Sequence, residues 1–159
     1  RTLFASSACG ICGAASLERI EKRAPAQVRP ITVAPSVLHG LPATLQKAQA
    51  VFDQTGGLHA AALFDASGQL EVMREDIGRH NAVDKVIGWR LRRDEVPIDD
   101  RVLLVSGRAG FEIVQKAAVA GIPLIAAVGA PSSLAAALAK QVGMGLIGFL
   151  RNGRYNVYC

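Results

Sequence analysis

Cys9 and Cys12, two of the three cysteines in the chain, are separated by two residues within the small-residue segment 7–13. At this spacing one thiol can carry a transferable sulfur or a mixed disulfide while the other resolves it, or both can ligate a metal. The flanking glycines would leave both sulfurs open to solvent and to a partner's backbone. The motif therefore indicates thiol or sulfur chemistry first, with metal binding and a chance pair as alternatives.

A metal site is the weaker of these alternatives. A structural zinc site usually needs four ligands, supplied by a second C-x-x-C or by paired histidines. The chain offers one cysteine pair, its three histidines are widely separated, and Cys159 has no partner at a useful spacing. A Ser-His-Asp hydrolase is also poorly supported, because the chain contains no G-x-S-x-G segment. We therefore expect no metal bound within one chain.

Polar residues and glycines gather at three junctions between an expected strand and the next helix, at 74–81, 106–110 and 129–133. In open α/β sheets, ligands bind outside the carboxyl ends of strands, where helix N-termini offer unpaired N–H groups to a phosphate. Arg79 and Arg108 could balance its charge, and the glycines would let it approach the main chain. We predict a phosphate-bearing ligand across these loops, although ordinary helix caps use the same residue types.

Within these loops, His80 is the candidate proton-transfer group, since it lies close in sequence to Asp76 and Asp84. A helix-capping or hydrogen-bonded histidine is the more common alternative. The full set of candidate ligand contacts in the loops is Arg79, His80, Ser106, Gly107 and Arg108.

The periodicity of apolar residues predicts the elements that must position these side chains. A helix over 42–53, with Pro42 in its first turn, should precede a hairpin and then an alternation of helices and strands. Together they predict a mixed α/β sheet with helices on both faces. The expected elements after the first helix are strands 58–65 and 69–74, a helix containing 82–87, strand 101–105, helix 111–120, strand 123–128, helix 132–142 and strand 144–150.

Asn152-Gly153 is the strongest hairpin signal in the chain and predicts a last strand over 155–158. Arg151 and Arg154 flank this turn. They could clamp an anion there, or they could form the solvated tip of an ordinary hairpin.

The composition fits one α/β domain, since half of the 159 residues are hydrophobic. The net charge is +5 and 13 arginines outnumber 5 lysines, which favours an anionic ligand. Nothing resembles a nucleic-acid module with interleaved aromatics, so a small anion is a better candidate than a nucleic acid polymer. Apolar runs such as 122–128 are too short to cross a membrane, and three cysteines make no disulfide framework. We therefore expect a reducing, cytoplasmic location.

Two parts are expected along the chain. Residues 1–36 would hold the cysteine-motif loop and a segment punctuated by prolines, and residues 37–159 would form the α/β cofactor-binding domain. Because the chain begins at Arg1 with the reactive motif almost at its terminus, we expect a fragment of a longer protein.

Taken together, these segments resemble the formate dehydrogenase accessory sulfurtransferase family. The resemblance covers essentially the whole chain, corresponds to the C-terminal part of the family's usual length, and is most specific in REDIGRHNAVDKVIG over 74–88. Further matches are the cysteine motif, GLHAAALF over 57–64, SGRAGFEIVQKAAVAGIP over 106–123, APSSLA over 130–135 and GFLRNGRYNVY over 148–158.

The resemblance implies a cytidine-deaminase-like fold without deaminase chemistry, and the chain indeed lacks the H-x-E and P-C-x-x-C segments of zinc deaminases. It implies that sulfur arrives as a persulfide from a cysteine desulfurase and passes to the molybdenum or tungsten bis-guanine-dinucleotide cofactor of formate dehydrogenase. Cys9 would carry the persulfide, and Cys12 would relay or resolve it. The family segment assigned to this guanine-nucleotide-containing pterin cofactor matches Phe149, Leu150, Arg151, Asn152, Gly153 and Arg154.

Two positions depart from the family pattern. Gly110 stands where family members often have Ser, and Gly129 replaces a similar small polar residue. Neither change removes a charge, but either could weaken a hydrogen bond to phosphate.

Two other functions stay open at this point. A non-enzymatic cofactor-binding chaperone would use the cysteines only to assist docking. A thiol–disulfide oxidoreductase would place the cysteine pair beside a thioredoxin-like βαβ unit, whereas this chain places it before a proline-rich stretch. A homodimer is expected, because a second subunit would shield the cysteine segment.

Overall fold

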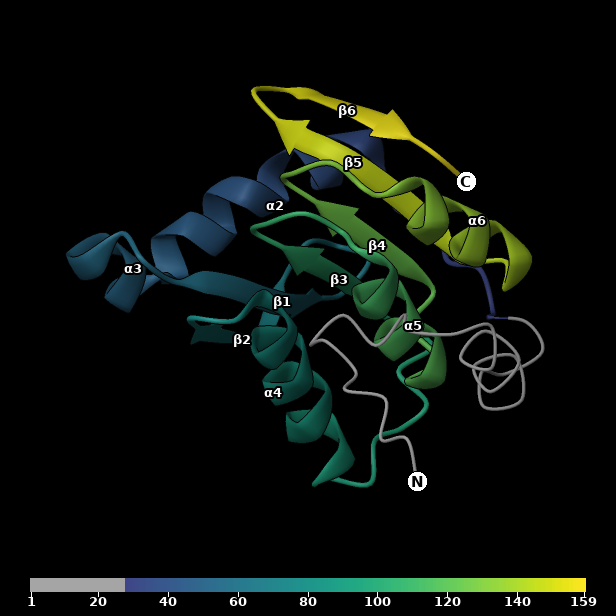
Figure 1. Ribbon diagram of the computed structural model, residues 1–159, viewed down its shortest axis with the longest axis horizontal. Helices are drawn as coiled ribbons and strands as arrows, with labels where there is room; N and C mark the ends of the chain where they lie inside the picture. Colours follow the sequence, from purple (N-terminus) through teal and green to yellow (C-terminus); the bar gives the residue numbers. More distant parts are fainter. Residues whose placement is uncertain (1–27) are drawn as a thin grey trace, which may run out of the picture.

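A six-stranded sheet forms the centre of the fold in the computed structural model, which describes residues 28–159 (Figure 1). Its strands lie in the order β2-β1-β3-β4-β5-β6. β3, β4 and β5 run parallel to one another, whereas β1 is antiparallel to both β2 and β3, and β6 is antiparallel to β5. The strands are β1 (His59–Phe64), β2 (Leu70–Asp76), β3 (Val102–Val105), β4 (Leu124–Ala127), β5 (Gly145–Arg151) and β6 (Arg154–Val157).

Helices cover both faces of this sheet (Figure 1). On one face lie α4 (Arg79–Leu91), α5 (Phe111–Val119) and α6 (Ser133–Gln141). On the opposite face lies α2 (Pro35–Ala48), which is followed by α3 (Ala50–Thr55). The predicted mixed α/β sheet with helices on both faces is therefore confirmed. Of the helices in residues 28–159, none combines the length and the apolar character that a membrane span needs.

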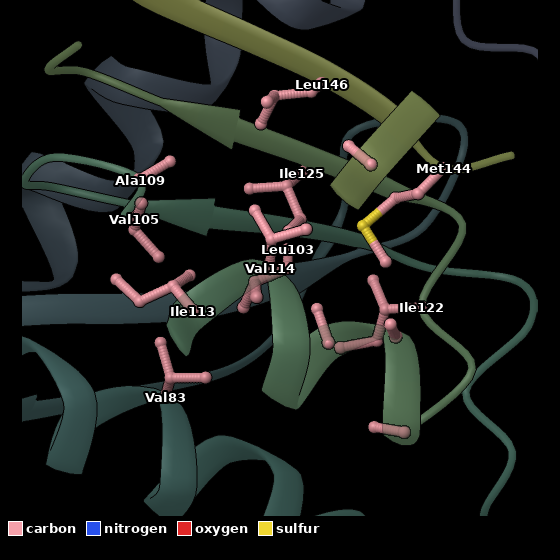
Figure 2. Close-up of a cluster of buried hydrophobic side chains, with 14 of the residues drawn as sticks. Val83, Leu103, Val105, Ala109, Ile113, Val114, Ile122, Ile125, Met144 and Leu146 are labelled. Carbon is pink, nitrogen blue, oxygen red and sulfur yellow. The ribbon is translucent and has the colours of Figure 1, made fainter. Parts of the chain in front are cut away.

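Each face of the sheet has its own hydrophobic cluster. Leu103 and Val105 of β3 belong to the larger cluster against α4–α6, whereas Val102 and Leu104 belong to the smaller one under α2. Figure 2 shows part of the larger cluster, in which side chains from β3 and α5 point toward one another. Because all four β3 residues are buried, the strand is hydrophobic throughout, as is typical of an internal parallel strand.

Local signals mark where several elements begin, end or turn. The Ser132 hydroxyl accepts the N–H of Ala135 at 3.1 Å and caps α6. Gly56, with a φ of 64°, ends α3. Asn152 and Gly153 have φ values of 53° and 68°, so the β5–β6 hairpin turns through two left-handed residues as its Asn-Gly signal predicts. The predicted strands and helices after residue 58 are found, with shifts of a few residues at their ends.

The first helix differs from its prediction. α2 begins at Pro35, seven positions before the expected start, and Pro42 lies inside it rather than in its first turn. Pro35 presets the backbone of the first turn, and Leu38, Leu41 and Leu45 form the buried face. Sequence reasoning treated Pro42 as a start signal, but burial of this leucine face outweighs the hydrogen bond that an internal proline removes.

The expected helix also ends early and restarts. α2 stops at Ala48, and α3 begins after Gln49. The carboxylate of Glu75, at the end of β2, accepts the N–H groups of Val51 and Phe52 at 3.2 and 2.8 Å. A residue 24 positions away along the chain thus caps α3, which no local pattern could indicate.

The α/β unit also extends N-terminal to the boundary expected at residue 37. The first two residues of α2 lie before that boundary. Val28 is buried in the larger cluster, and its N–H donates to the Val142 carbonyl at 2.9 Å. The segment that begins at Val28 is therefore anchored beside the end of α6.

Candidate functional site

One end of the sheet collects all the junctions that the sequence singled out. Because β3, β4 and β5 are parallel, their carboxyl ends lie at the same edge, and their arrowheads point to the same side in Figure 1. β1 begins at this edge, where His59 pairs with Asp76 at the end of β2. The N-termini of α4, α5 and α6 follow β2, β3 and β4 and lie here too. We call this edge the carboxyl end of the sheet.

Backbone hydrogen bonds join the junction loops into one layer, which we call the loop layer. The N–H of Gly129 donates to the Gly107 carbonyl at 3.0 Å, and the N–H of Phe149 donates to the Gly129 carbonyl at 3.0 Å. The N–H of Ser132 donates to the Ala109 carbonyl at 3.1 Å. A Cβ on Gly129 would lie 2.9 Å from the Gly107 oxygen, so this approach requires a glycine. Two of the three predicted loops, 106–110 and 129–133, therefore lie in contact, and Phe149 at the start of segment 149–154 joins them.

Ser106 ties the start of β1 to the loop layer. Its hydroxyl oxygen accepts the N–H of Ala60 at 2.8 Å, and its own N–H donates to the Ala60 carbonyl at 2.9 Å. The ring of His59 lies against Gly107, where a Cβ would come within 3.3 Å of Nδ1. The hydroxyl oxygen of Ser106 thus has a structural role, and the hydroxyl proton can be donated in a hydrogen bond to a ligand.

Asp76 orients the N-terminus of α4. Its carboxylate accepts the N–H of Gly78 at 2.9 Å and the side-chain amide of Asn81 at 3.0 Å, and it forms an ion pair with Lys85 at 2.6 Å. These donors, led by Lys85, lower the pKa of Asp76 to about 2. Asp76 therefore holds the loop in place and is not a proton donor at neutral pH.

A cavity of about 500 Å³ opens between the N-termini of α4, α5 and α6; we call it the helix-side cavity. Two of the predicted ligand residues, Arg79 and Arg108, line it, and neither forms an ion pair with any residue in 28–159. The Nε of Arg79 is buried and has no hydrogen-bond partner. The complete lining is Arg79, Arg108, Ala109, Gly110, Phe111, Glu112, Ala130, Pro131, Ser132 and Leu134.

His80 faces a neighbouring groove between α4 and α5. Its Nε2 lies 3.5 Å from the carboxylate of Glu112. Burial, reinforced by the Arg79 cation, lowers the pKa of His80 below its usual value, so the imidazole is neutral at pH 7. Asp84, which lies four residues after His80, forms an ion pair with Lys116 at 2.6 Å.

On the other side of the loop layer, a second cavity of about 400 Å³ lies against α2; we call it the α2-side cavity. Five predicted ligand residues line it: Ser106, Leu150, Arg151, Asn152 and Gly153. Gln46 and Gln49 add amide groups from α2 and its end, and Phe52 adds an aromatic ring. Such a mixture of amides, a ring and an arginine can bind a base and an anionic group together.

The middle of the segment from Phe149 to Arg154 lines this second cavity, whereas Phe149 and Arg154 themselves line a smaller hollow beside it. Phe149 has a φ of 55°, and the pairing of β5 with β6 is irregular between Gly148 and Arg151. Arg151 lies over the Phe149 ring, 6.0 Å from its centroid, and Arg154 is exposed on the outer side of the turn. Like Arg79 and Arg108, these two arginines form no ion pair within the part of the chain that the structure describes.

The predicted ligand residues thus converge at one end of the sheet but divide between its two sides. No residue lines both the helix-side and the α2-side cavity. Sequence reasoning missed Gln46, Gln49 and Glu112, because helix residues without a motif carry no signal for a site. Gln49 is 6% exposed, and a buried polar residue becomes visible only once burial is known.

The predicted catalytic pair, Cys9 and Cys12, lies outside the described residues. Cys159 donates its thiol to the Met144 carbonyl at 3.3 Å, and burial raises the pKa of this thiol. It therefore lies at the amino end of β5, away from the loop layer. Within residues 28–159, no three His, Cys, Asp or Glu side chains gather closely enough to hold a metal ion.

The sequence is similar to that of proteins named sulfur carrier protein FdhD. The protein from Mycobacterium tuberculosis is 55% identical over 161 residues, covering 99% of this chain and 58% of the relative. The one from Thermoplasma acidophilum is 50% identical over 153 residues, covering 96% of this chain and 54% of the relative. The chain therefore spans little more than half the length of these relatives.

The fold agrees with this similarity. A crystal structure of a formate dehydrogenase accessory protein from Desulfotalea psychrophila matches with a TM-score of 0.78 and 30% sequence identity, over 89% of this chain and 59% of that chain. By its architecture the chain is thus a mixed α/β protein that shares its fold with this neighbour. Because the model of the FdhD/NarQ family matches residues 1–159, the chain belongs to that family, as its motifs predict.

Proposed function

We propose that this chain is a sulfur carrier that serves formate dehydrogenase. Sulfur would travel as a persulfide on Cys9, with Cys12 as its relay or resolving partner. A cysteine desulfurase would supply it, and the molybdenum or tungsten bis-guanine-dinucleotide cofactor would receive it. The names of the relatives, the similarity to a formate dehydrogenase accessory protein and the C-x-x-C pair support this proposal.

The observation that carries the proposal is the set of four arginines around the loop layer that lack carboxylate partners among the described residues: Arg79, Arg108, Arg151 and Arg154. Elsewhere in the fold, buried arginine is neutralised; Arg90, for example, pairs with Glu71 at 2.9 Å. Arginines without carboxylate partners suit a polyanionic ligand, and two of the four, Arg79 and Arg108, lie beside helix N-termini. A dinucleotide cofactor with its pyrophosphate linkages has this character.

The α2-side cavity would bind the guanine nucleotide portion. Gln46, Gln49 and Asn152 offer both donors and acceptors, which the edge of guanine requires. Phe52 offers an aromatic face, and Arg151 offers charge to a phosphate. Residues 150–153 of the family segment thus line one side of this cavity, and residues of α2 line another.

The sulfur steps balance without an additional oxidant. A thiolate of Cys9 attacks the terminal sulfur of the desulfurase persulfide, which leaves a thiolate on the desulfurase and a persulfide on Cys9. When the Cys12 thiolate then attacks the inner sulfur of Cys9, hydrosulfide leaves and a Cys9–Cys12 disulfide forms. A dithiol reductant returns the pair to thiols. If Cys12 is a relay instead, it takes the terminal sulfur from Cys9 and no disulfide forms.

The test follows sulfur through the cysteines. After incubation with a cysteine desulfurase and L-cysteine, mass spectrometry should find one added sulfur atom on Cys9 or Cys12. Cys9→Ala should abolish activation of formate dehydrogenase and leave binding of guanosine diphosphate unchanged. Cys159→Ala is the matched control and should leave both properties intact, because that thiol packs at the opposite end of β5.

The same variants separate sulfur transfer from a purely binding function. If the double variant Cys9→Ala/Cys12→Ala still matures formate dehydrogenase, the protein is a cofactor-binding chaperone, and sulfur transfer is ruled out. A cytoplasmic location and a homodimer that shields the cysteine segment are further parts of the proposal. Size-exclusion chromatography with light scattering tests the dimer.

A further inference from the structure

The helix-side cavity lies on the opposite side of the loop layer from segment 149–154. Gly129 and Gly107, joined by the 3.0 Å hydrogen bond, lie between the two cavities. A group bound in one cavity therefore contacts none of the residues that line the other. The helix-side cavity is therefore a candidate site with its own set of lining residues.

Three independent features of this cavity point to a multiply charged oxyanion. Arg79 and Arg108 bring two cations without ion-pair partners in residues 28–159. The buried Nε of Arg79 is a donor that no described residue satisfies, and such groups in native proteins usually meet a ligand, an ion or water. The N-terminus of α5 follows Gly110 and has no side-chain cap; the Ile113 N–H donates to the Gly110 carbonyl, and the N–H groups of Phe111 and Glu112 have no acceptor among residues 28–159.

The acidic lining residue also fits this assignment. Glu112 is the one carboxylate among the lining residues, and its side chain is only 12% exposed. Its Oε2 lies 3.5 Å from His80 and 3.2 Å from the point that a Cβ on Gly110 would occupy, so the carboxylate lies beside the N-terminus of α5. The two arginine cations and the positive ends of the helices outnumber this single negative charge. A single carboxylate ligand carries too little charge to pair with both arginines, whereas a diphosphate carries enough.

We propose that the helix-side cavity is a diphosphate-binding site, formed by Arg79, Arg108 and the N-terminus of α5 and separate from segment 149–154. The diphosphate comes either from the pyrophosphate linkage of the pterin dinucleotide or from a free phosphate compound. The site itself does not depend on sulfur transfer. Only the first of these sources rests on the proposed function.

The experiment uses the full 159-residue chain with inorganic pyrophosphate, guanosine diphosphate and guanosine as probes. Pyrophosphate should shift the Nε–H resonance of Arg79 in ¹⁵N-correlated NMR spectra. Arg108→Gln should weaken pyrophosphate binding by at least about tenfold in calorimetry, since a charge-assisted hydrogen bond is removed. Arg79→Lys should also weaken it, because lysine keeps the charge but loses the Nε–H donor.

Arg92→Gln is the matched control for the loss of one positive charge. Arg92 is exposed at the far end of α4, and its removal should change the affinity for pyrophosphate less than about twofold. Unchanged melting temperatures in all variants show that the fold is intact, which is expected for Arg108 because its side chain is exposed.

The probes separate the two sources. If Arg108→Gln weakens the binding of guanosine diphosphate as much as the binding of pyrophosphate, the nucleotide places its own diphosphate in this cavity. If only the binding of pyrophosphate is weakened, the site binds a free phosphate compound. The proposal would be overturned if both arginine variants bound pyrophosphate with wild-type affinity. It would also be overturned if added pyrophosphate shifted only the NMR resonances of Arg151 and Arg154. None of these readouts involves Cys9, so failure here leaves sulfur transfer to be judged by its own test.

Discussion

Gly129→Ala should destabilise the protein and open the loop layer. A Cβ at this position would lie 2.9 Å from the Gly107 oxygen, 3.0 Å from the Gly107 carbonyl carbon and 3.0 Å from the Arg108 nitrogen. All three atoms belong to the backbone, and all are closer than the 3.4 Å at which ordinary van der Waals contact begins. The β3–α5 and β4–α6 loops must therefore separate to admit one methyl group.

Two costs add to give the magnitude. Overpacking at a tightly packed site costs about 1–3 kcal/mol. Separation of the loops also weakens the hydrogen bond from Gly129 to Gly107, which contributes about 0.5–1.5 kcal/mol. We expect a loss of about 2–4 kcal/mol in the free energy of unfolding, and a fall of roughly 5–15 °C in melting temperature for a chain of this size.

Gly88→Ala is the matched control for the same chemical change. Gly88 lies inside α4, and a Cβ there would meet nothing within 4 Å. This variant should gain about 0.5–1 kcal/mol, since alanine loses less conformational entropy than glycine in a helix.

Urea titration of both variants, followed by circular dichroism, gives the two free energies. Gly129→Ala should also weaken guanosine diphosphate binding, because Phe149 hydrogen-bonds to the Gly129 carbonyl. The reasoning is refuted if Gly129→Ala melts within about 1 °C of the parent chain, a change below the expected cost of any overpacking. Loops that accept a methyl group without cost would not form the tight layer described above.

Two further predictions concern α6 and His80. Ser132→Ala removes the cap on the Ala135 N–H and should cost about 1 kcal/mol in thermal or urea unfolding, whereas Ser133→Ala should cost nearly nothing; equal effects of the two variants would contradict the capping role. The pKa of His80 is lower in the folded state than its usual value of 6.5, so the folded state binds this proton more weakly than the unfolded state. The contribution of His80 to stability is therefore present above pH 6.5 and is lost as the pH falls through the lowered pKa of the folded state. Urea midpoints measured between about pH 7.5 and about pH 5 should fall less in His80→Gln than in the parent chain, and parallel curves would show that burial does not affect its proton.

Local signals explain why much of the fold was predictable. Asn152-Gly153 adopts left-handed backbone in both residues, and Ser132 caps α6, because each signal acts on its own neighbours. The start of α2 was not predictable in the same way. Pro42 is a valid first-turn residue, yet burial of Leu38 and Leu41 under the sheet extends the helix back to Pro35. Local preference and tertiary packing disagree there, and packing is stronger.

In the candidate site, too, some features follow from the sequence and others only from the tertiary structure. Sequence alone determined the residue types, the Cys9–Cys12 spacing, the three glycine-rich junctions and the family, since these depend on side-chain chemistry and on order along the chain. Tertiary structure decided that the junctions form one layer, because the contact of Gly129 with Gly107 depends on β3 and β4 being neighbours. It also decided which side of that layer each arginine faces. Arg108 and Arg151 carry the same charge, but the path of each loop assigns them to different cavities.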